Sequence, residues 1–179
     1  MLRPQLIILT GLPGTGKSTL AHHAARLLGC PIFGKDHLEA TLWRAGLRRE
    51  QRSGFIAQDL LNTLADGQLR LGQSAILDSV ATIERVRAPW RHLAAEHGAD
   101  FRVVESVCSD EAIHRQRLAG RNRGFPGWPE LSWEDVEDVR SRFEPWADER
   151  LILDACAPLE TNLVALRHHL SAAQRMLNR

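Results

Sequence analysis

Cysteine is scarce in this chain, and long apolar runs are missing. Its three cysteines, Cys30, Cys108 and Cys156, lie far apart and lack zinc-type spacing, so we expect reduced thiols in a cytoplasmic protein without zinc. No apolar run approaches the ~20 residues of a membrane span. Arg3-Pro4 leads straight into a strand-like stretch, so we expect neither a signal peptide nor a membrane partner.

A strong excess of basic charge is also missing, because the formal net charge is only +1. Bulk charge therefore gives no reason to expect nucleic-acid binding. The basic side chains are 21 arginines and only two lysines, Lys17 and Lys35. A hydrophobic content of 44% is ordinary for a globular protein. With no repeat, linker or low-complexity tract, residues 1–179 are expected to form one domain.

The stretch Gly11–Ser18 reads GLPGTGKS and matches G-x-x-x-x-G-K-[ST] at every fixed position. It follows the apolar run Leu6–Leu9 and opens into a helical pattern, which is the strand–loop–helix context of a P-loop. Such a loop points successive backbone N–H groups at phosphates, while Lys17 reaches the β- and γ-phosphates and Ser18 binds Mg²⁺. The expected nucleotide-binding residues are Gly11, Pro13, Gly14, Thr15, Gly16, Lys17, Ser18 and Thr19.

Short apolar runs alternate with helical patterns along the chain, which predicts an α/β fold with a parallel sheet. Strands are expected at Gln5–Thr10, Cys30–Phe33, Ser74–Leu77, Phe101–Val107 and Leu151–Leu153. Helical patterns cover residues 19–28, 37–45, 53–71, 82–97, about 110–121 and 132–144, and a last helix ends near Leu177.

Helical spacing also predicts which faces pack against the core. The helical pattern over residues 53–71 presents Ile56, Leu60 and Leu64 on one face. In the pattern over residues 82–97, Pro89 should kink or restart the helix. The first and last helices are expected to pack through Leu20, Ala24 and Leu27, and through Leu163, Leu166, Leu170, Ala173 and Leu177.

Two aspartates follow predicted strands at the edge where open α/β sheets bind ligands. Asp78 follows the predicted strand Ser74–Leu77 and has no glutamate after it to activate water, which favours transfer to an acceptor over hydrolysis. It could support Mg²⁺, hold the acceptor hydroxyl, or cap the next turn. Asp36 follows another strand and could orient an acceptor hydroxyl, cap the next helix, or do both.

Arginines gather before a loop rich in glycine, proline and aromatics, Arg123–Pro129. Arg117 and Arg121 are at i, i+4 on one helical face, whereas Arg115 points away. Guanidinium groups on this segment could close over the triphosphate as a lid, or they could simply favour a helix C-terminus. A second basic group could grip an acidic or phosphorylated acceptor, or form a solvated face; it comprises Arg44, Arg48, Arg49 and Arg52.

Together, GLPGTGKST, Asp36, ILDSV and the arginine helix resemble the P-loop kinase family. The likeness is to small kinases filed as AAA-type ATPase domains, whose relatives include polynucleotide 5′-hydroxyl kinases, chloramphenicol phosphotransferase, zeta-type toxin kinases and gluconate kinases. This resemblance implies a three-layer fold with strand order 2-3-1-4-5 and a lid over about residues 115–132. It implies catalytic roles for Lys17, Asp36, Arg117, Arg121 and Arg123, a metal role for Ser18 and Asp78, and an adenine-binding loop at 154–158.

These observations predict a kinase that uses ATP and Mg²⁺ to phosphorylate a hydroxyl of a small molecule. One alternative is a polynucleotide 5′-hydroxyl kinase. Relatives of that type place an arginine close behind the base aspartate, whereas His37, Leu38 and Glu39 follow Asp36 here. The other alternative is an ATP-binding regulatory protein whose slow hydrolysis changes its shape without an acceptor. The sequence names no acceptor.

Overall fold

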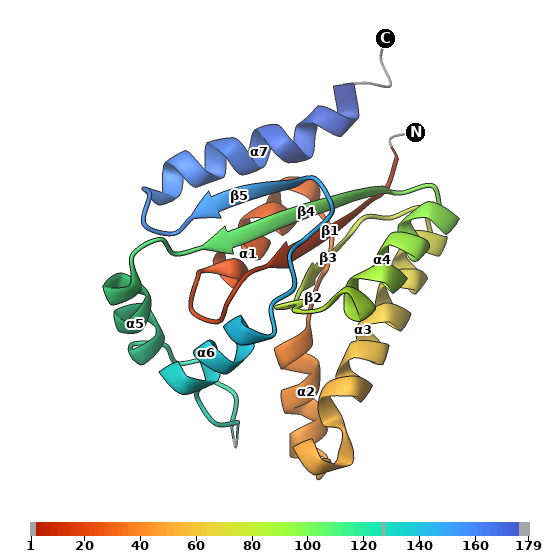
Figure 1. The fold of residues 1–179 in the computed structure, drawn as a ribbon. Helices are drawn as coiled ribbons and strands as arrows, with labels where there is room; N and C mark the ends of the chain where they lie inside the picture. The colour runs from red at the N-terminus through yellow and green to blue at the C-terminus, as the bar shows by residue number, and fades with distance from the viewer. Residues whose placement is uncertain (1–2, 127, 176–179) are drawn as a thin grey trace.

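The computed structural model describes residues 3–126 and 128–175 (Figure 1). Within this part, five strands form one parallel sheet in the order β2-β3-β1-β4-β5, so the expected order 2-3-1-4-5 is confirmed. The strands are β1 (Gln5–Thr10), β2 (Ile32–Gly34), β3 (Ala75–Asp78), β4 (Asp100–Val107) and β5 (Arg150–Asp154).

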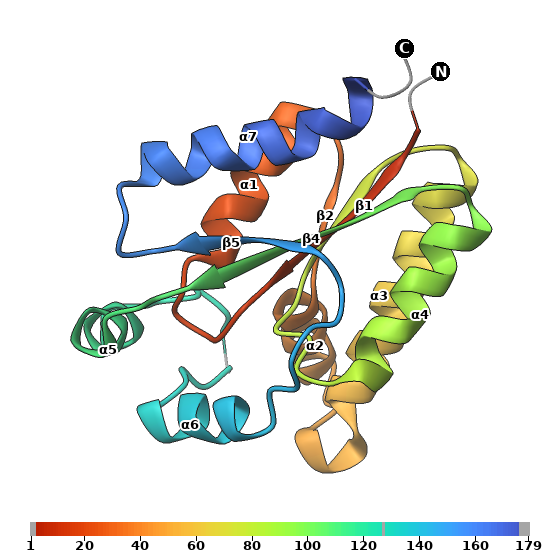
Figure 2. The same cartoon turned by 45° about the horizontal axis from the view of Figure 1, so that its top comes forward.

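Helices cover both faces of the sheet, which gives a three-layer α/β fold (Figures 1 and 2). α1 and α7 pack on one face, and α3 and α4 pack on the other, while α2, α5 and α6 lie beyond the carboxyl ends of the strands. The helices are α1 (Lys17–Leu28), α2 (Lys35–Arg44), the 3₁₀ turn η1 (Arg49–Gln51), α3 (Ser53–Arg70), α4 (Glu84–Glu96), α5 (Glu111–Ala119), α6 (Trp133–Ser141) and α7 (Leu159–Arg175). Among the described helices, none has the length and hydropathy to span a membrane.

The central strand β1 is buried on both faces and divides the core in two. Successive side chains of a strand point to opposite faces. Leu6 and Ile8 therefore join the cluster under α3 and α4, whereas Ile7 and Leu9 join the cluster under α1 and α7. This burial fixes the carboxyl end of β1, where Gly11–Ser18 begins.

The helix boundaries agree with several sequence signals. Gly29 ends α1 in a left-handed conformation, and the Asp110 side chain caps α5 by accepting from the Ile113 N–H. Ser132 and Asp135 form a capping box at the start of α6. These caps satisfy backbone groups that a helix end leaves free.

The predicted packing face of α3 is wrong. Ile56, Leu60 and Leu64 are each more than a third exposed, and the helix instead buries the adjacent row Ala57, Leu61, Ala65 and Leu69. Two parallel i, i+4 rows run along this helix, and the row with alanines allows α3 to approach its neighbours closely. The smaller side chains therefore face the core.

Three other helix predictions need correction or limits. Leu27 is 43% exposed, so α1 packs through Leu20, Ala21 and Ala24. α4 runs from Glu84 to Glu96 through Pro89 without restarting. In α7, Leu166 and Leu170 are buried as expected, whereas Leu177 and the side chain of Ala173 lie outside the described residues.

A fully buried arginine joins two segments near the carboxyl edge of the sheet. Arg87 of α4 donates hydrogen bonds to the carbonyl oxygens of Ala81 and Thr82 after β3. It also donates to those of Glu144 and Pro145 between α6 and β5. Its guanidinium lies 4.1 Å from the Trp146 ring centroid, within cation–π range. Arg87 thus fixes the loop after β3 against the segment that leaves α6.

Candidate active site

The loop Gly11–Gly16 adopts backbone conformations that its sequence permits. Gly11 has a φ of +129°, and a Cβ at this position would lie 2.0 Å from the Ser106 carbonyl oxygen. Gly14 has a φ of +87° and packs against the His114 ring. Positive φ values at these positions suit glycine, and the contact at Gly11 leaves no room for any side chain.

Side chains from neighbouring elements hold this loop in place. Ser106 of β4 donates to the Thr15 carbonyl oxygen at 2.5 Å, and the Thr15 hydroxyl donates to the Leu12 carbonyl oxygen at 2.9 Å. The buried His114 of α5 contacts the Pro13 carbonyl oxygen through Nε2 at 2.7 Å. The sequence analysis did not single out Ser106 or His114, because each lies about a hundred residues from the loop and belongs to no local motif.

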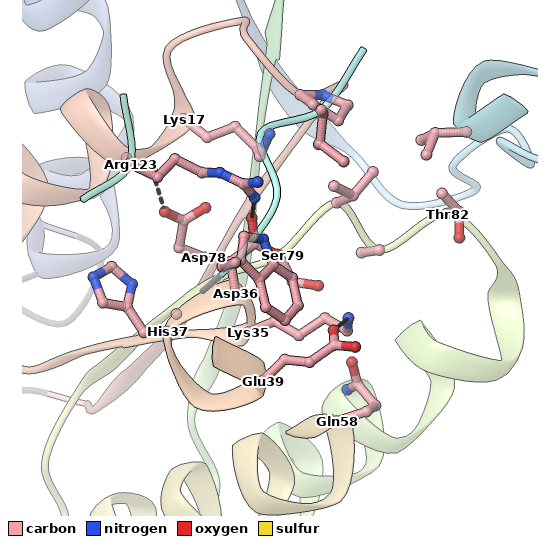
Figure 3. Close-up of a pocket in the computed structure, with 18 of the residues that line it drawn as sticks. Lys17, Lys35, Asp36, His37, Glu39, Gln58, Asp78, Ser79, Thr82 and Arg123 are labelled. Atoms are coloured by element: carbon pink, nitrogen blue, oxygen red, sulfur yellow. Dashed lines mark hydrogen bonds and ion pairs between the residues drawn. The ribbon is translucent and has the colours of Figure 1, made fainter. Parts of the chain in front are cut away.

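Lys17 is buried at the start of α1 and donates from Nζ to the Leu12 carbonyl oxygen at 2.9 Å. Burial lowers the pKa of Lys17, while the negative charges of Asp78 and Asp36 act in the opposite direction. Both carboxylates are therefore close enough to affect the same ammonium group. This arrangement collects one cation and two anions next to the glycine loop (Figure 3).

The side chain of Ser18, in the first turn of α1, contacts that of Asp78. Asp78 is the last residue of β3, and the Ser18 hydroxyl donates to its Oδ2 at 2.7 Å. The structure thus pairs the two residues that the sequence predicted as metal ligands. A carboxylate and a hydroxyl are hard oxygen donors of the kind that Mg²⁺ takes from proteins, together with phosphate oxygens and water.

Asp36 lies in the first turn of α2, at the carboxyl end of β2. Gly34 occupies the N-cap position, so capping by the Asp36 side chain is not its role here. Its carboxylate accepts from Arg123 Nη1 at 3.3 Å, and its side chain is 38% exposed to the pocket and solvent. Asp36 therefore keeps room for a further hydrogen-bond partner.

Arg123 organises the lid loop, defined here as residues 120–126 and 128–132 between α5 and α6. Its backbone N–H and Nε donate to the two Glu130 carboxylate oxygens at 2.9 and 3.0 Å, and Nη2 donates to the Pro129 carbonyl oxygen. The Arg123 side chain is only 4% exposed. One guanidinium group thus ties the two ends of the loop together and joins them to Asp36.

Aromatic contacts attach the lid loop to α2. The rings of Phe125 and His37 meet edge to face with centroids 4.5 Å apart, and those of Trp128 and Trp43 lie 4.8 Å apart. Such pairs contribute about 0.5–1.5 kcal/mol beyond the area that they bury. The lid loop is therefore positioned over the α2 side of the site.

Three adjoining pockets run along this edge of the sheet. The first, about 260 Å³, is lined by Lys17, Asp36, Asp78 and Arg121, among others, and reaches α2 and α3 through Lys35, Glu39 and Gln58. Both lysines of the chain thus line this pocket. The second, about 230 Å³, lies over Gly14–Thr19 and is walled by Arg117 and Arg121. The third, about 220 Å³, lies between Thr19, Arg117 and the loop after β5, where Ala155 and Ala157 face it.

The predicted arginines divide between these pockets. Arg117 and Arg121 flank the glycine loop in the second pocket. Arg121 also lines the first pocket, together with Arg123, which contacts Asp36. Arg115 pairs with Glu111 and points away, as expected. Of the second basic group, Arg49 lines the first pocket.

Comparison with known proteins agrees with this geometry. A family model described as an AAA domain matches residues 6–146. An adenylate kinase of Mycobacterium tuberculosis is 28% identical over 155 residues, covering 80% of each chain. A solved structure described as a candidate kinase of Chloroflexus aurantiacus superposes with a TM-score of 0.74 at 26% identity, covering 93% of this chain and 98% of that chain. A gluconokinase of Sinorhizobium meliloti shares the fold, with a TM-score of 0.71 at 16% identity over 99% of this chain and 98% of that chain.

The chain belongs to this AAA domain family, which the kinase relatives place among the P-loop kinases. It is a nucleotide-dependent phosphotransferase. The relatives do not share one acceptor.

Proposed function

We propose that this protein transfers the γ-phosphoryl group of ATP to a hydroxyl of a small-molecule acceptor, with Mg²⁺. The observation that carries the proposal is the first pocket, which joins Asp36 to the phosphate-binding residues Lys17 and Ser18 in one continuous space. An acceptor in this pocket would reach the end of a triphosphate chain lying over the glycine loop. In-line transfer requires this relation between acceptor and phosphate.

The second and third pockets fit the nucleotide. Backbone N–H groups at the start of α1 and the arginines of α5 suit the phosphates. Burial lowers the pKa of Arg121, and the charge of Arg123 lowers it further. A negatively charged ligand beside Arg121 would favour its charged form and so oppose both effects on its pKa. The base would lie in the third pocket against the loop after β5, near Ala155 and Ala157.

Ser18 and Asp78 fit the Mg²⁺ that such a kinase needs. Their oxygens lie 2.7 Å apart at the edge of the phosphate pocket. An ion held there neutralises charge on the β- and γ-phosphates. Lys17 adds a second positive charge on the same side, and the backbone of the loop supplies N–H donors.

Asp36 is proposed to orient the attacking hydroxyl. A loose phosphoryl-transfer transition state depends more on position than on a strong base, so a carboxylate hydrogen-bonded to the hydroxyl is sufficient. Arg123 fixes that carboxylate from the lid side. An alcohol has a proton to donate to the Asp36 carboxylate, whereas an ionised phosphate acceptor, as an adenylate kinase uses, has none, and this favours an alcohol.

The wall opposite the phosphates suits a small polar acceptor. The Glu39 carboxylate accepts from Lys35 Nζ at 2.6 Å and from the Ser53 hydroxyl at 2.9 Å, while Gln58 lines the same floor. Phe125 and Trp128 of the lid loop also line the pocket. A compact acceptor with several polar groups would satisfy this mixture better than the end of a nucleic-acid strand.

The test is transfer of label from γ-labelled ATP to a panel of sugars, sugar acids, amino alcohols, antibiotics, AMP and oligonucleotide 5′ ends. A labelled small alcohol, absent with Lys17→Ala, supports the proposal. Labelled AMP would replace the alcohol by a phosphate acceptor, and salt-sensitive labelling of oligonucleotides would favour the polynucleotide alternative. Tight ATP binding without any labelled product would favour a regulatory protein.

A further inference from the structure

Two cysteines that are far apart in the sequence lie side by side in the structure. The sulfur atoms of Cys108 and Cys156 are 3.4 Å apart, although 48 residues separate them. Both residues are partly exposed, so a small reagent can reach them. Separation in the sequence does not predict this contact, and the expectation of reduced thiols stays a prediction for all three cysteines.

Adjacent strands place the two cysteines. β4 and β5 pair in parallel up to Val107 and Asp154, and the cysteines follow just beyond this last pair. The Ala155 N–H donates to the Val107 carbonyl oxygen at 2.8 Å. Asp154 Oδ1 accepts from the N–H groups of Ser109 at 3.1 Å and Cys156 at 2.9 Å. The backbone around both thiols is thus fixed by one carboxylate and one strand pair.

A disulfide needs little movement from this arrangement. The S–S bond is about 2 Å long, so the sulfurs have only ~1.4 Å to close. Side-chain rotation can supply much of that distance, because both cysteines lie outside the helices and strands, Cys156 in a turn and Cys108 in the segment after β4.

The pair also borders the proposed nucleotide site. Ala155 and Ala157, on either side of Cys156, line the third pocket. Cys108 leads into α5, which carries Arg117 of the same pocket and His114, whose ring contacts the Pro13 carbonyl oxygen. A covalent bond would draw the loop after β5 towards the segment that leads into α5, and the lining of the pocket that these two elements share would shift from its present shape.

We propose that Cys108 and Cys156 form a reversible disulfide that weakens ATP binding, with a small disulfide such as oxidised glutathione as the oxidant. The Cys156 thiol loses its proton, and its thiolate attacks one sulfur of the oxidant and releases one thiol. The Cys108 thiolate then attacks the Cys156 sulfur of the mixed disulfide and releases the second. The protein pair loses two electrons and two protons, and the oxidant becomes two thiols.

The effect on ATP depends on the proposed nucleotide site, whereas the cross-link does not. Burial and the hydrogen bond with Cys156 raise the pKa of the Cys108 thiol to about 11. The reaction is therefore expected to be slow at neutral pH and to speed up as the pH rises, because the thiolate is the attacking species.

The experiment incubates the full chain with oxidised glutathione at increasing pH and follows mass, thiol content and ATP binding. We expect loss of two hydrogen masses, a Cys108–Cys156 peptide on mapping, one remaining thiol, and several-fold weaker ATP binding that a reductant restores. Cys30→Ser is the matched control: it should form the same internal disulfide with the same effect on ATP binding, and no free thiol should remain. Cys108→Ser and Cys156→Ser should instead stop at one glutathione adduct.

Other results would overturn the proposal. Stable mixed disulfides on both cysteines, or cross-linked dimers in place of the internal bond, would show that the two sulfurs do not close on each other. An internal disulfide with unchanged ATP binding would remove the link to the nucleotide site, and it would leave the kinase assignment untouched. Failure of the reduced wild-type protein to bind ATP would count against the proposed function itself.

Discussion

Arg123 lies 3.3 Å from the Asp36 carboxylate, although 87 residues separate them in the sequence. The contact joins the lid loop to the first turn of α2, at the pocket where we place the acceptor. Lid position and the orientation of Asp36 are therefore coupled. Arg117 lines the other two pockets, whereas Arg121 lines both this pocket and the one over the glycine loop.

Arg123→Ala should raise KM for the acceptor by about tenfold and change KM for ATP much less, because it releases both Asp36 and Glu130. Glu130→Ala should produce part of the same effect. In a double-mutant cycle of Arg123→Ala and Glu130→Ala, the coupling free energy between the two residues should be about 1 kcal/mol, within the range for contacting residues. Equal rises in both KM values, or strict additivity, would contradict this role.

Asp36→Asn should lower kcat by about 100-fold or more while ATP affinity stays near that of the wild type, because only transition-state positioning is lost. Steady-state kinetics and direct ATP binding measure the two quantities separately. Asp59→Asn, at an exposed position of α3, is the matched control and should behave as wild type. A parallel collapse of ATP binding in Asp36→Asn would show a structural role instead.

Arg87→Ala should lower the free energy of unfolding by about 3–5 kcal/mol, because it leaves four carbonyl oxygens without their buried donor and opens a cavity beside Trp146. Arg85→Ala, two residues earlier on an exposed position, should change it by less than ~0.5 kcal/mol. Chemical denaturation compares the two. Similar losses in both variants would mean that the Arg87 contacts contribute little.

Asp154 should make the fold sensitive to acid. Hydrogen bonding by Ser109 and by the Cys156 backbone lowers the pKa of Asp154 from 3.8 to about 2. A carboxyl with a lowered pKa in the folded state stabilises the protein above its unfolded pKa. That stability is lost as the pH falls from about 4 to 2. Asp154→Asn should be less stable at neutral pH and lose less stability across this acid range, as denaturation at each pH would reveal.

Much of the fold follows from local patterns. The strands follow from short apolar runs, and the caps at Asp110 and Ser132 rest on hydrogen bonds within a few residues. The order of the strands was implied only by the resemblance. The predicted packing face of α3 is wrong because the helix carries two apolar rows with the same spacing, so the spacing does not show which row faces the core. The row with alanines faces the core because it allows α3 to approach the neighbouring elements closely, and a single sequence does not give the distance between α3 and those elements.

The candidate site likewise has a local part that the sequence predicts and long-range contacts that it does not. Gly11–Ser18 is contiguous, so its conformation could be predicted from the motif. The contacts of Ser106 and His114 with that loop, the Arg123–Asp36 pair and the Cys108–Cys156 pair all join segments separated by at least 48 residues. They depend on the order of strands and on side-chain direction at the sheet edge, which no spacing rule supplies.

The placement of both lysines in one pocket makes the chain a simple target for chemical labelling. Apart from the α-amino group, Lys17 and Lys35 carry its only primary amines. Burial lowers the pKa of Lys17, so more of this amine is in the reactive neutral form than an exposed lysine would provide. An amine-directed reagent would therefore report on occupancy of this pocket with little background from the arginine-rich surface, and an acceptor that protects these amines could be recognised before any turnover is measured.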